Sequence, residues 1–178
     1  MRIIGGEYGG RRFNPPAHMP HTRPTTDIAK EGLFNMLQHR IDFTSVKTLD
    51  LFGGTGSISY ELASRGATDL TIVEKDPVMH RFISQTLITL GIEGASVIRS
   101  DVFRFIEQCH SAFDFIFAGP PYALTTIDEL PRLIFQQKVV APGGLFVLEH
   151  TPRNDYSQFP FYQQQRNYGT TVFSFFVN

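Results

Sequence analysis

Apolar and polar positions follow two alternating periods along most of the chain, and each change of period marks a new element. Short, nearly continuous apolar runs predict strands buried on both faces, and apolar residues three or four positions apart predict helices. From residue 46 onward, strand-like and helix-like segments alternate. The expected strands are 46–52, 70–73, 95–98, 113–118 and 145–149, and the expected helices are 57–64, 77–90, 102–108 and 127–136.

The C-terminal end breaks this rhythm. Segments 161–168 and 170–177 both have the pattern of strands, and no helix fits between them, so they predict an antiparallel hairpin at one edge of the sheet. The repeated strand–helix units predict a parallel sheet with helices on both faces. The expected fold class is α/β, with a Rossmann-like, mostly parallel seven-stranded sheet that ends in an antiparallel hairpin. This is the arrangement of class I S-adenosylmethionine (SAM)-dependent methyltransferases.

The N-terminal end also has its own pattern. Segments 2–5 and 11–13 predict a short strand and a return strand around a glycine-rich turn. A proline-rich connection follows, and apolar spacing after a set of capping side chains predicts a helix at 26–39. We expect 1–178 to form one methyltransferase domain, in which 1–24 are an N-terminal basic hairpin and connection.

Charge is distributed unevenly along the chain. Residues 1–40 hold six basic and three acidic side chains, a net charge of +3, whereas the remainder holds ten basic and fourteen acidic side chains, a net charge of −4. This asymmetry is compatible with an anionic partner at the N-terminal segment. Arg2, Arg11 and Arg12 are the candidate contacts, because they flank the glycine-rich turn.

Composition limits the class of protein. The chain has 178 residues, of which 42% are hydrophobic and 19% charged, as in ordinary soluble globular proteins. No run approaches the ~20 apolar residues that span a bilayer, and the N-terminus lacks the apolar stretch of a signal peptide. The single cysteine, Cys109, excludes an internal disulfide and suits a reducing compartment. We therefore expect a cytoplasmic protein with no membrane contact and no metal site.

A glycine-rich loop follows the first long strand. It contains Gly53, Gly54 and Gly56 after Asp50 and leads into a helix, so a ligand can approach its backbone closely and meet the N–H groups of the helix start. Loops of this kind bind SAM or a dinucleotide such as NAD. The dinucleotide pattern requires another glycine or alanine three residues after Gly56, where this chain has Ser59. The loop therefore favours SAM.

Acidic residues follow the next two strands. Glu74 lies 20 positions after Gly54, and Asp101 follows the third long strand. The carboxyl ends of parallel strands line one crevice, where such sheets bind their ligands. A carboxylate at the end of the second strand can accept two hydrogen bonds from a ribose diol. These positions predict a nucleoside-containing ligand.

The segment Gly119, Pro120, Pro121 and Tyr122 follows the fourth strand. Two prolines stiffen the backbone and fix the direction of the Pro120 carbonyl. An aromatic ring next to them can stack on a flat base. Because this segment lies where a methyl acceptor must bind, its four residues are the candidate catalytic residues. It has no role in a dinucleotide-binding fold, which again favours SAM.

With these motifs the whole chain resembles a known family, the bacterial 16S rRNA guanine-N2 methyltransferases of the RsmD type. The resemblance implies that SAM is the cofactor and that a methyl group is transferred to the exocyclic N2 of a guanine in 16S rRNA, within the small ribosomal subunit. The motifs that carry it are Met1-Arg-Ile-Ile-Gly-Gly6, Arg23-Pro-Thr-Thr-Asp27, Glu31-Gly-Leu-Phe-Asn35, Asp50-Leu-Phe-Gly-Gly-Thr-Gly56, Ser64-Arg-Gly-Ala67, Val73-Glu-Lys-Asp76 and Tyr168-Gly-Thr170.

The same resemblance implies roles for individual residues. Asp50, Gly54 and Gly56 flank the methionine part of SAM, while Glu74 binds its ribose and Asp101 its adenine. Tyr122 stacks on the target guanine. The expectation that Arg2, Arg11 and Arg12 contact RNA comes from the charge distribution described above. The full set of expected cofactor-binding residues is Arg23, Thr25, Asp50, Phe52, Gly54, Gly56, Glu74, Lys75, Asp101 and Val102.

One position departs from the family. Its motif is Asp-Pro-Pro-Tyr or Asp-Pro-Pro-Phe, whereas this chain has Gly119 in the place of the aspartate. The lone pair of a guanine amino group is delocalised into the ring, so two acceptors, a side-chain oxygen and the Pro120 carbonyl, are needed to orient it toward the methyl group. Loss of the side-chain acceptor costs about 10²–10⁴ in rate. The enzyme is impaired or altered, a water or another carboxylate replaces the aspartate, or the sequence has been changed at this position.

Other functions stay open at this point. A related enzyme could methylate an amino group of a DNA adenine or of a protein glutamine. A non-catalytic SAM- and RNA-binding ribosome assembly factor would also fit Gly119, and detection of methyl transfer separates it from the enzymes. A NAD-dependent oxidoreductase is disfavoured by the glycine loop and by Pro120-Pro121-Tyr122.

Overall fold

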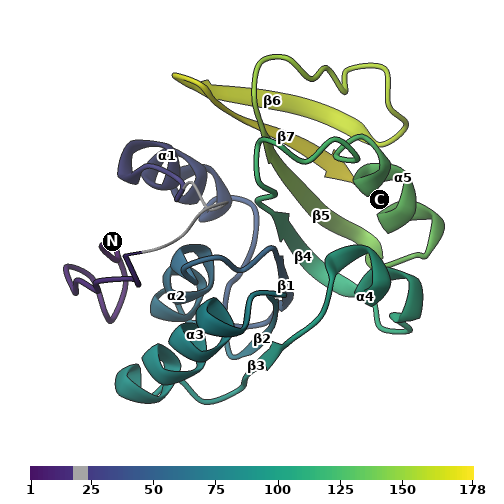
Figure 1. Ribbon diagram of the computed structural model, residues 1–178. Helices are drawn as coiled ribbons and strands as arrows, with labels where there is room; N and C mark the ends of the chain where they lie inside the picture. Colours follow the sequence, from purple (N-terminus) through teal and green to yellow (C-terminus); the bar gives the residue numbers. More distant parts are fainter. Residues whose placement is uncertain (18–23) are drawn as a thin grey trace.

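The computed structural model describes residues 1–17 and 24–178, and it shows the alternation expected from the sequence (Figure 1). Most helices and strands lie within one or two residues of their expected bounds. In the described residues the strands are β1 (Lys47–Leu51), β2 (Asp69–Val73), β3 (Ala95–Ile98), β4 (Phe113–Ala118), β5 (Val140–His150), β6 (Tyr162–Tyr168) and β7 (Thr171–Val177). The helices are α1 (Asp27–Leu37), α2 (Ser57–Ser64), α3 (Pro77–Leu90), α4 (Val102–Gln108) and α5 (Glu129–Gln136).

The strands form one seven-stranded sheet in the order β3-β2-β1-β4-β5-β7-β6. Neighbours from β3 to β5 are parallel, whereas β7 is antiparallel to β5 and β6 is antiparallel to β7. This confirms the expected α/β fold class with a C-terminal antiparallel hairpin. The chain builds outward from β1 to β3 and then returns to place β4 on the other side of β1, so the order reverses between β1 and β4.

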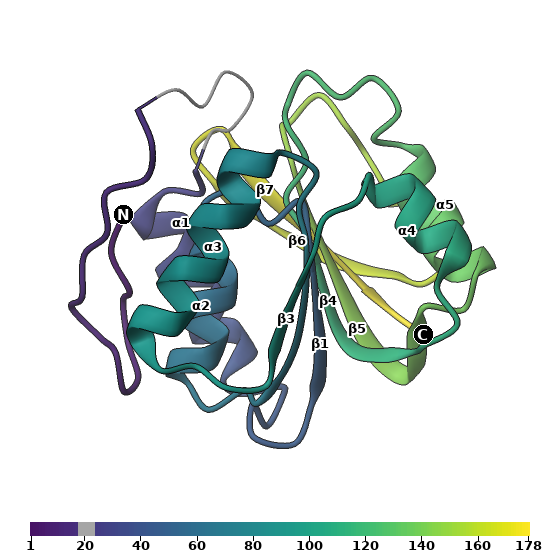
Figure 2. The same cartoon turned by 60° about the horizontal axis from the view of Figure 1, so that its bottom comes forward.

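Helices cover both faces of the sheet, with α1, α2 and α3 on one side and α4 and α5 on the other (Figure 2). Apart from the exposed Asp114 near its start, β4 is apolar, and its successive residues show why. Phe115 and Phe117 pack with α1 and α2, whereas Ile116 packs with α4 and α5. All three are 0–2% exposed. Strand side chains alternate between faces, so a strand covered on both sides has no polar face.

A buried carboxylate and Ser64 of α2 hold the N-terminal segment on that helix. Glu61, fully buried, accepts hydrogen bonds from the backbone N–H groups of Ile4 at 2.7 Å and Gly5 at 2.9 Å, and it pairs with Arg65 at 2.9 Å. The expected pair of short strands is reduced to an isolated antiparallel bridge between Arg2 and Arg12. Backbone hydrogen bonds still join the two segments, from the Ile3 N–H to the Arg11 carbonyl and from the Phe13 N–H to the Met1 carbonyl.

Two element bounds differ from expectation. Strand β5 begins at Val140, five residues earlier than expected, because Val140 pairs with Phe113 before an irregularity at Pro142–Gly144 shifts the register. Helix α5 begins at Glu129 instead of residue 127, after a turn. In the part of the chain that the structure describes, no helix is long and apolar enough to cross a membrane.

Candidate active site

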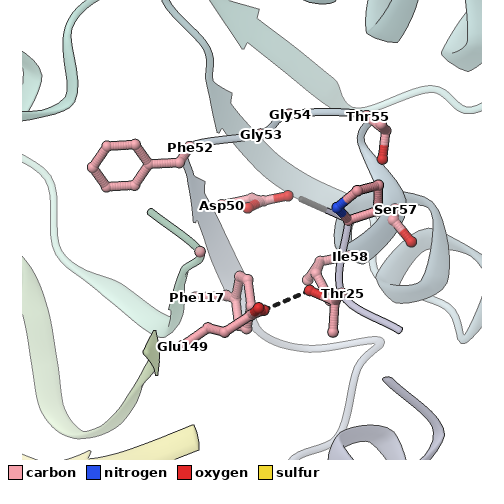
Figure 3. A pocket seen from close by; sticks show the side chains of 12 residues that line it. Thr25, Asp50, Phe52, Gly53, Gly54, Thr55, Ser57, Ile58, Phe117 and Glu149 are labelled. Atoms are coloured by element: carbon pink, nitrogen blue, oxygen red, sulfur yellow. Dashed lines mark hydrogen bonds between the residues drawn. The ribbon is translucent and has the colours of Figure 1, made fainter. Parts of the chain in front are cut away.

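A pocket lies at the carboxyl ends of β1 and β4, where the strand order reverses (Figure 3). Open α/β sheets bind their ligands at such a switch point, because the two chain directions leave a crevice there. The residues that line the pocket come from the segment before α1, the end of β1 and the loop after it, the start of α2, the end of β4 and the end of β5. They are Pro24, Thr25, Asp50, Phe52, Gly53, Gly54, Thr55, Ser57, Ile58, Phe117, Gly119 and Glu149.

Asp50 is a buried acid at the end of β1. In the alternation of this strand it faces α2, and Ser59 on α2 donates a hydrogen bond to its Oδ2 at 2.6 Å. Only 3% of Asp50 is exposed, and this burial raises the pKa of its carboxyl to about 7. The hydrogen bond from Ser59 lowers this pKa, and the charge of Glu74 raises it. Among the described residues Asp50 has no ion pair. A cationic ligand group beside it would restore its ionised form.

Two positions of the glycine loop, Gly53 and Gly56, leave no room for a side chain. A Cβ on Gly53 would lie 2.7 Å from Cγ2 of Ile72, and a Cβ on Gly56 would lie 2.4 Å from the Tyr60 ring. Gly56 also has a φ of 79°, which favours glycine. Phe52 adopts a φ of 64° although it is not a glycine, so backbone strain of about 1–3 kcal/mol is stored at the rim of the pocket.

Glu74, at the end of β2, is joined directly to this loop. Its Oε2 accepts the backbone N–H of Gly54 at 2.7 Å, and its Oε1 accepts the backbone N–H of Asp76 at 2.8 Å. Each carboxylate oxygen has a second lone pair, so the side chain keeps capacity for a ligand diol. Lys75, which follows it, is exposed. The loop and the second acidic residue therefore form one unit, as their spacing in the sequence predicts.

Asp101 and Val102 lie apart from this pocket. Asp101 is the N-cap of α4, where its Oδ1 accepts the N–H groups of Phe103 at 3.0 Å and Arg104 at 3.3 Å, and it lines a separate hollow with Ser100. The side chain of Val102 is buried in the core between the sheet and α4. The expected adenine contact of Asp101 remains a prediction, and Val102 can offer a ligand only its backbone.

The Gly119–Tyr122 segment begins beside the end of β1, since the N–H of Gly119 bonds to the carbonyl of Leu51 at 3.2 Å. Pro120 is buried. The hydroxyl of Tyr122 donates to Oε1 of Glu149 at 3.1 Å and lies 3.1 Å from the hydroxyl of Thr171. The structure thus brings Gly119 together with Asp50 and the glycine loop in one pocket, and it ties Tyr122 to an acid that the sequence motifs did not indicate.

Glu149 is a charged pocket residue to which sequence reasoning assigned no role. It is 3% exposed, its side chain points into the pocket, and Thr25 Oγ1 donates to its Oε2 (Figure 3). Thr25, an expected cofactor-binding residue, lines the same pocket. The available signal was the position of Glu149: like Asp50, it is an acidic residue at the carboxyl end of an apolar strand.

The remaining expected residues lie elsewhere. Arg23 falls outside the described residues. Arg11 and Arg12 are exposed, and the guanidinium of Arg11 lies 5.1 Å from the centre of the Tyr8 ring. Arg2 is half-exposed and pairs with Asp27 at 3.4 Å. Within residues 1–17 and 24–178, no group of three or more His, Cys, Asp or Glu side chains is arranged to hold a metal ion.

Solved structures share this architecture. A hypothetical protein of Thermus thermophilus has a TM-score of 0.86 at 29% identity, covering 99% of this chain and 98% of that chain. The 16S rRNA N2 G1207 methyltransferase RsmC of T. thermophilus, solved with AdoMet and guanosine, has a TM-score of 0.69 at 23% identity, covering 86% of this chain and 44% of that chain. The strand order, the hairpin and the pocket at the switch point are those of a class I SAM-dependent methyltransferase fold.

The chain belongs to the family described as conserved hypothetical protein 95, whose model matches residues 1–177. Its curated relatives include the ribosomal RNA small subunit methyltransferase D of Escherichia coli (strain K12), 32% identical over 154 residues, which make up 86% of this chain and 76% of the relative. The enzyme of the same name from Haemophilus influenzae is 32% identical over 153 residues, covering 84% of this chain and 78% of the relative. The family expected from the sequence motifs is thereby confirmed.

Proposed function

We propose that this protein transfers a methyl group from SAM to the exocyclic N2 of a guanine in 16S rRNA, within the small ribosomal subunit. The observation that carries the proposal is the pocket that unites the glycine loop and Asp50 with Gly119, the first residue of the Pro-Pro-Tyr segment. In this proposal the glycine loop and Asp50 bind the cofactor, and the segment from Gly119 binds the acceptor beside it. The relatives named ribosomal RNA small subunit methyltransferase D support the choice of substrate.

The pocket residues fit the chemistry of SAM. The ammonium of its methionine part suits Asp50, a buried acid with a raised pKa. The loop backbone at Gly53 and Gly56 lies close to neighbouring side chains, because glycine has none of its own. Glu74 bonds to the Gly54 N–H, so a ribose diol at this point would meet both the loop and the Glu74 carboxylate. When bound, SAM supplies an electrophilic methyl group on a sulfonium. The protein accelerates the transfer mainly by holding the acceptor nitrogen in line with that methyl group.

The acceptor side uses the segment after β4. Pro120 is buried and its backbone is fixed by two consecutive prolines, so its carbonyl can accept one hydrogen bond from a guanine amino group in a constant direction. The ring of Tyr122 is half-buried and can stack on the base. The exposed Arg11 and Arg12 suit contacts to the RNA backbone. Action on the ribosome places the protein in the cytoplasm.

Two measurements test this function. Calorimetry should show binding of SAM and S-adenosylhomocysteine but not of NAD, and Glu74→Ala should weaken SAM binding by roughly 1.5–3 kcal/mol, because it removes charge-assisted hydrogen bonds. The matched control is Glu129→Ala, an exposed glutamate on α5. Incubation with labelled SAM and under-methylated small subunits, followed by nucleoside mass spectrometry, should show N2-methylguanine. Binding of NAD or a label on another base would refute the proposal.

A second function is favoured by Gly119 alone. Without an acceptor side chain at this position, the protein could bind SAM and RNA as an assembly factor and transfer no methyl group. The same incubation separates the two functions. Protein that binds both SAM and the small subunit, yet leaves every nucleoside unlabelled at long times, would be such a factor.

A further inference from the structure

The reaction proposed above leaves one need unmet at the acceptor site. A guanine amino group donates two hydrogen bonds, and two acceptors must hold it before its lone pair points at the methyl group. The Pro120 carbonyl supplies one acceptor. Gly119 has no side chain to supply the other, so a second acceptor has to come from another element that reaches the same pocket.

Two carboxylates line that pocket among the described residues, Asp50 and Glu149. Asp50 lies beside the glycine loop and is bonded to Ser59 on α2, which places it on the cofactor side. Glu149 comes from β5, the strand next to β4, at the same edge of the sheet as Gly119. A Cβ built on Gly119 would lie 3.8 Å from Oε2 of Glu149. A side-chain oxygen therefore already lies next to the space that a longer residue at position 119 would enter.

The contacts of Glu149 fix its direction. Thr25 Oγ1 donates to Oε2, and the Tyr122 hydroxyl donates to Oε1 at 3.1 Å. Tyr122 is in turn placed by Thr171 on β7. A carboxylate that is only 3% exposed is costly unless such donors compensate for lost water. An ionised carboxylate offers about four acceptor positions. These contacts hold the group in place with its side chain in the pocket, where a substrate N–H would meet it.

We propose that Glu149 is a catalytic residue that supplies the side-chain acceptor for the target amino group, in place of the residue missing at Gly119. Its carboxylate and the Pro120 carbonyl each accept one N–H of the amino group. The nitrogen lone pair then forms the new N–C bond while the electron pair of the S–C bond leaves with sulfur, which becomes a neutral thioether. The nitrogen, now positively charged, gives one proton to Glu149, which passes it to water.

The same geometry gives Tyr122 a second role. Besides presenting its ring to a base, it is a positioning residue for Glu149 through its hydroxyl. Tyr122→Phe keeps the ring and removes this hydrogen bond. It should therefore lower kcat when Glu149 is present and have no further effect in a Glu149→Gln background, because the two residues act as one unit.

The test compares four proteins in single-turnover methylation of small subunits: wild type, Glu149→Gln, Gly119→Asp and the double variant. Glu149→Gln keeps a side-chain oxygen but cannot take the proton, so it should reduce the rate by about 10²–10⁴ while SAM affinity stays within about threefold of wild type. In the Glu149→Gln background, Gly119→Asp should raise the methylation rate at least tenfold. In the wild-type background the same change should raise the rate little, because it places two carboxylates together. Glu107→Gln, an exposed glutamate on α4, is the control.

The outcomes separate this inference from the function on which it rests. If wild type methylates and Glu149→Gln is equally active, Glu149 does not take the proton, so this inference fails and the proposed function stands. If Glu149→Gln is slow but Tyr122→Phe slows the wild type and the Glu149→Gln variant equally, Glu149 has a structural role only. This comparison needs no change at position 119, where a Cβ would come within 3.0 Å of the Phe117 ring. If wild type and Gly119→Asp bind SAM and transfer no methyl group, the proposed function fails and this inference with it.

Discussion

Replacing Asp50 by asparagine tests whether the buried Asp50 carboxylate destabilises the ligand-free protein, a cost that a bound ligand would offset. Asp50 is 3% exposed, and burial raises the pKa of its carboxyl from the ordinary 3.8 to about 7. Asparagine has the same shape, keeps an oxygen for the Ser59 hydroxyl and carries no charge. In the ligand-free protein Asp50→Asn should therefore be more stable than wild type, and the difference should depend on pH.

The sign follows from proton linkage. Because the pKa is higher in the folded protein, the native state holds the Asp50 proton more tightly than the unfolded chain does. Between about pH 4 and about pH 7 the native state binds more protons, so the stability of wild type falls as pH rises through this window. A shift of about three units corresponds to about 4 kcal/mol. The advantage of Asp50→Asn should grow from roughly 2 kcal/mol at pH 5 to roughly 4 kcal/mol at pH 8.

Urea unfolding of both proteins at pH 5, 6, 7 and 8, without SAM, measures this difference. For a chain of this size the pH 8 value corresponds to a rise in Tm of about 8–16 °C. Asp69→Asn, an exposed aspartate at the start of β2, is the control and should show no such trend. The same Asp50→Asn protein should bind SAM more weakly, because it loses the charge that we propose as the partner of the SAM ammonium. A stability difference that is constant from pH 5 to pH 8 would refute the reasoning.

Three further predictions concern the fold and the RNA contacts. Gly32→Ala should destabilise the protein by about 1–3 kcal/mol in urea unfolding, although alanine favours helices, because a Cβ there would lie 2.3 Å from the Tyr168 ring. Glu61→Ala should cost about 3–5 kcal/mol and expose the N-terminal segment to hydrogen exchange, because it leaves buried polar partners uncompensated. Arg11→Ala combined with Arg12→Ala should flatten the salt dependence of RNA binding by roughly one to two log–log units, with SAM affinity unchanged.

Each of these has a control and a contrary result. Gly32→Ala should cost nothing further once Tyr168→Ala has removed the ring, and a gain in stability from Gly32→Ala alone would contradict the contact. Glu31→Ala, an exposed glutamate on α1, should leave stability near wild type. Arg132→Ala, on α5 at the opposite face of the sheet, should leave the salt slope unchanged. An equal slope for the Arg11 and Arg12 double variant would show that these side chains do not meet phosphates.

The sequence determined the order and the type of the elements, because periodicity is a local property of the chain. It also determined which strand ends carry polar residues, and parallel topology then places Asp50, Glu74 and Gly119 at one edge of the sheet. The expected sheet and the family follow from this information alone. The element bounds were least certain where glycine and proline interrupt a strand, as at the start of β5.

Contacts between distant segments were decided only by the tertiary structure. Gly32 reads as a weak point in α1, yet it is the place where the Tyr168 ring lies against the helix. Glu61 reads as an ordinary helix residue, yet it is fully buried and holds the first residues of the chain. Glu149 reads as the end of an apolar strand, and its closeness to Gly119 arises because β5 pairs with β4 in register. Such side chains acquire their roles from partners far away in sequence, which no local pattern encodes.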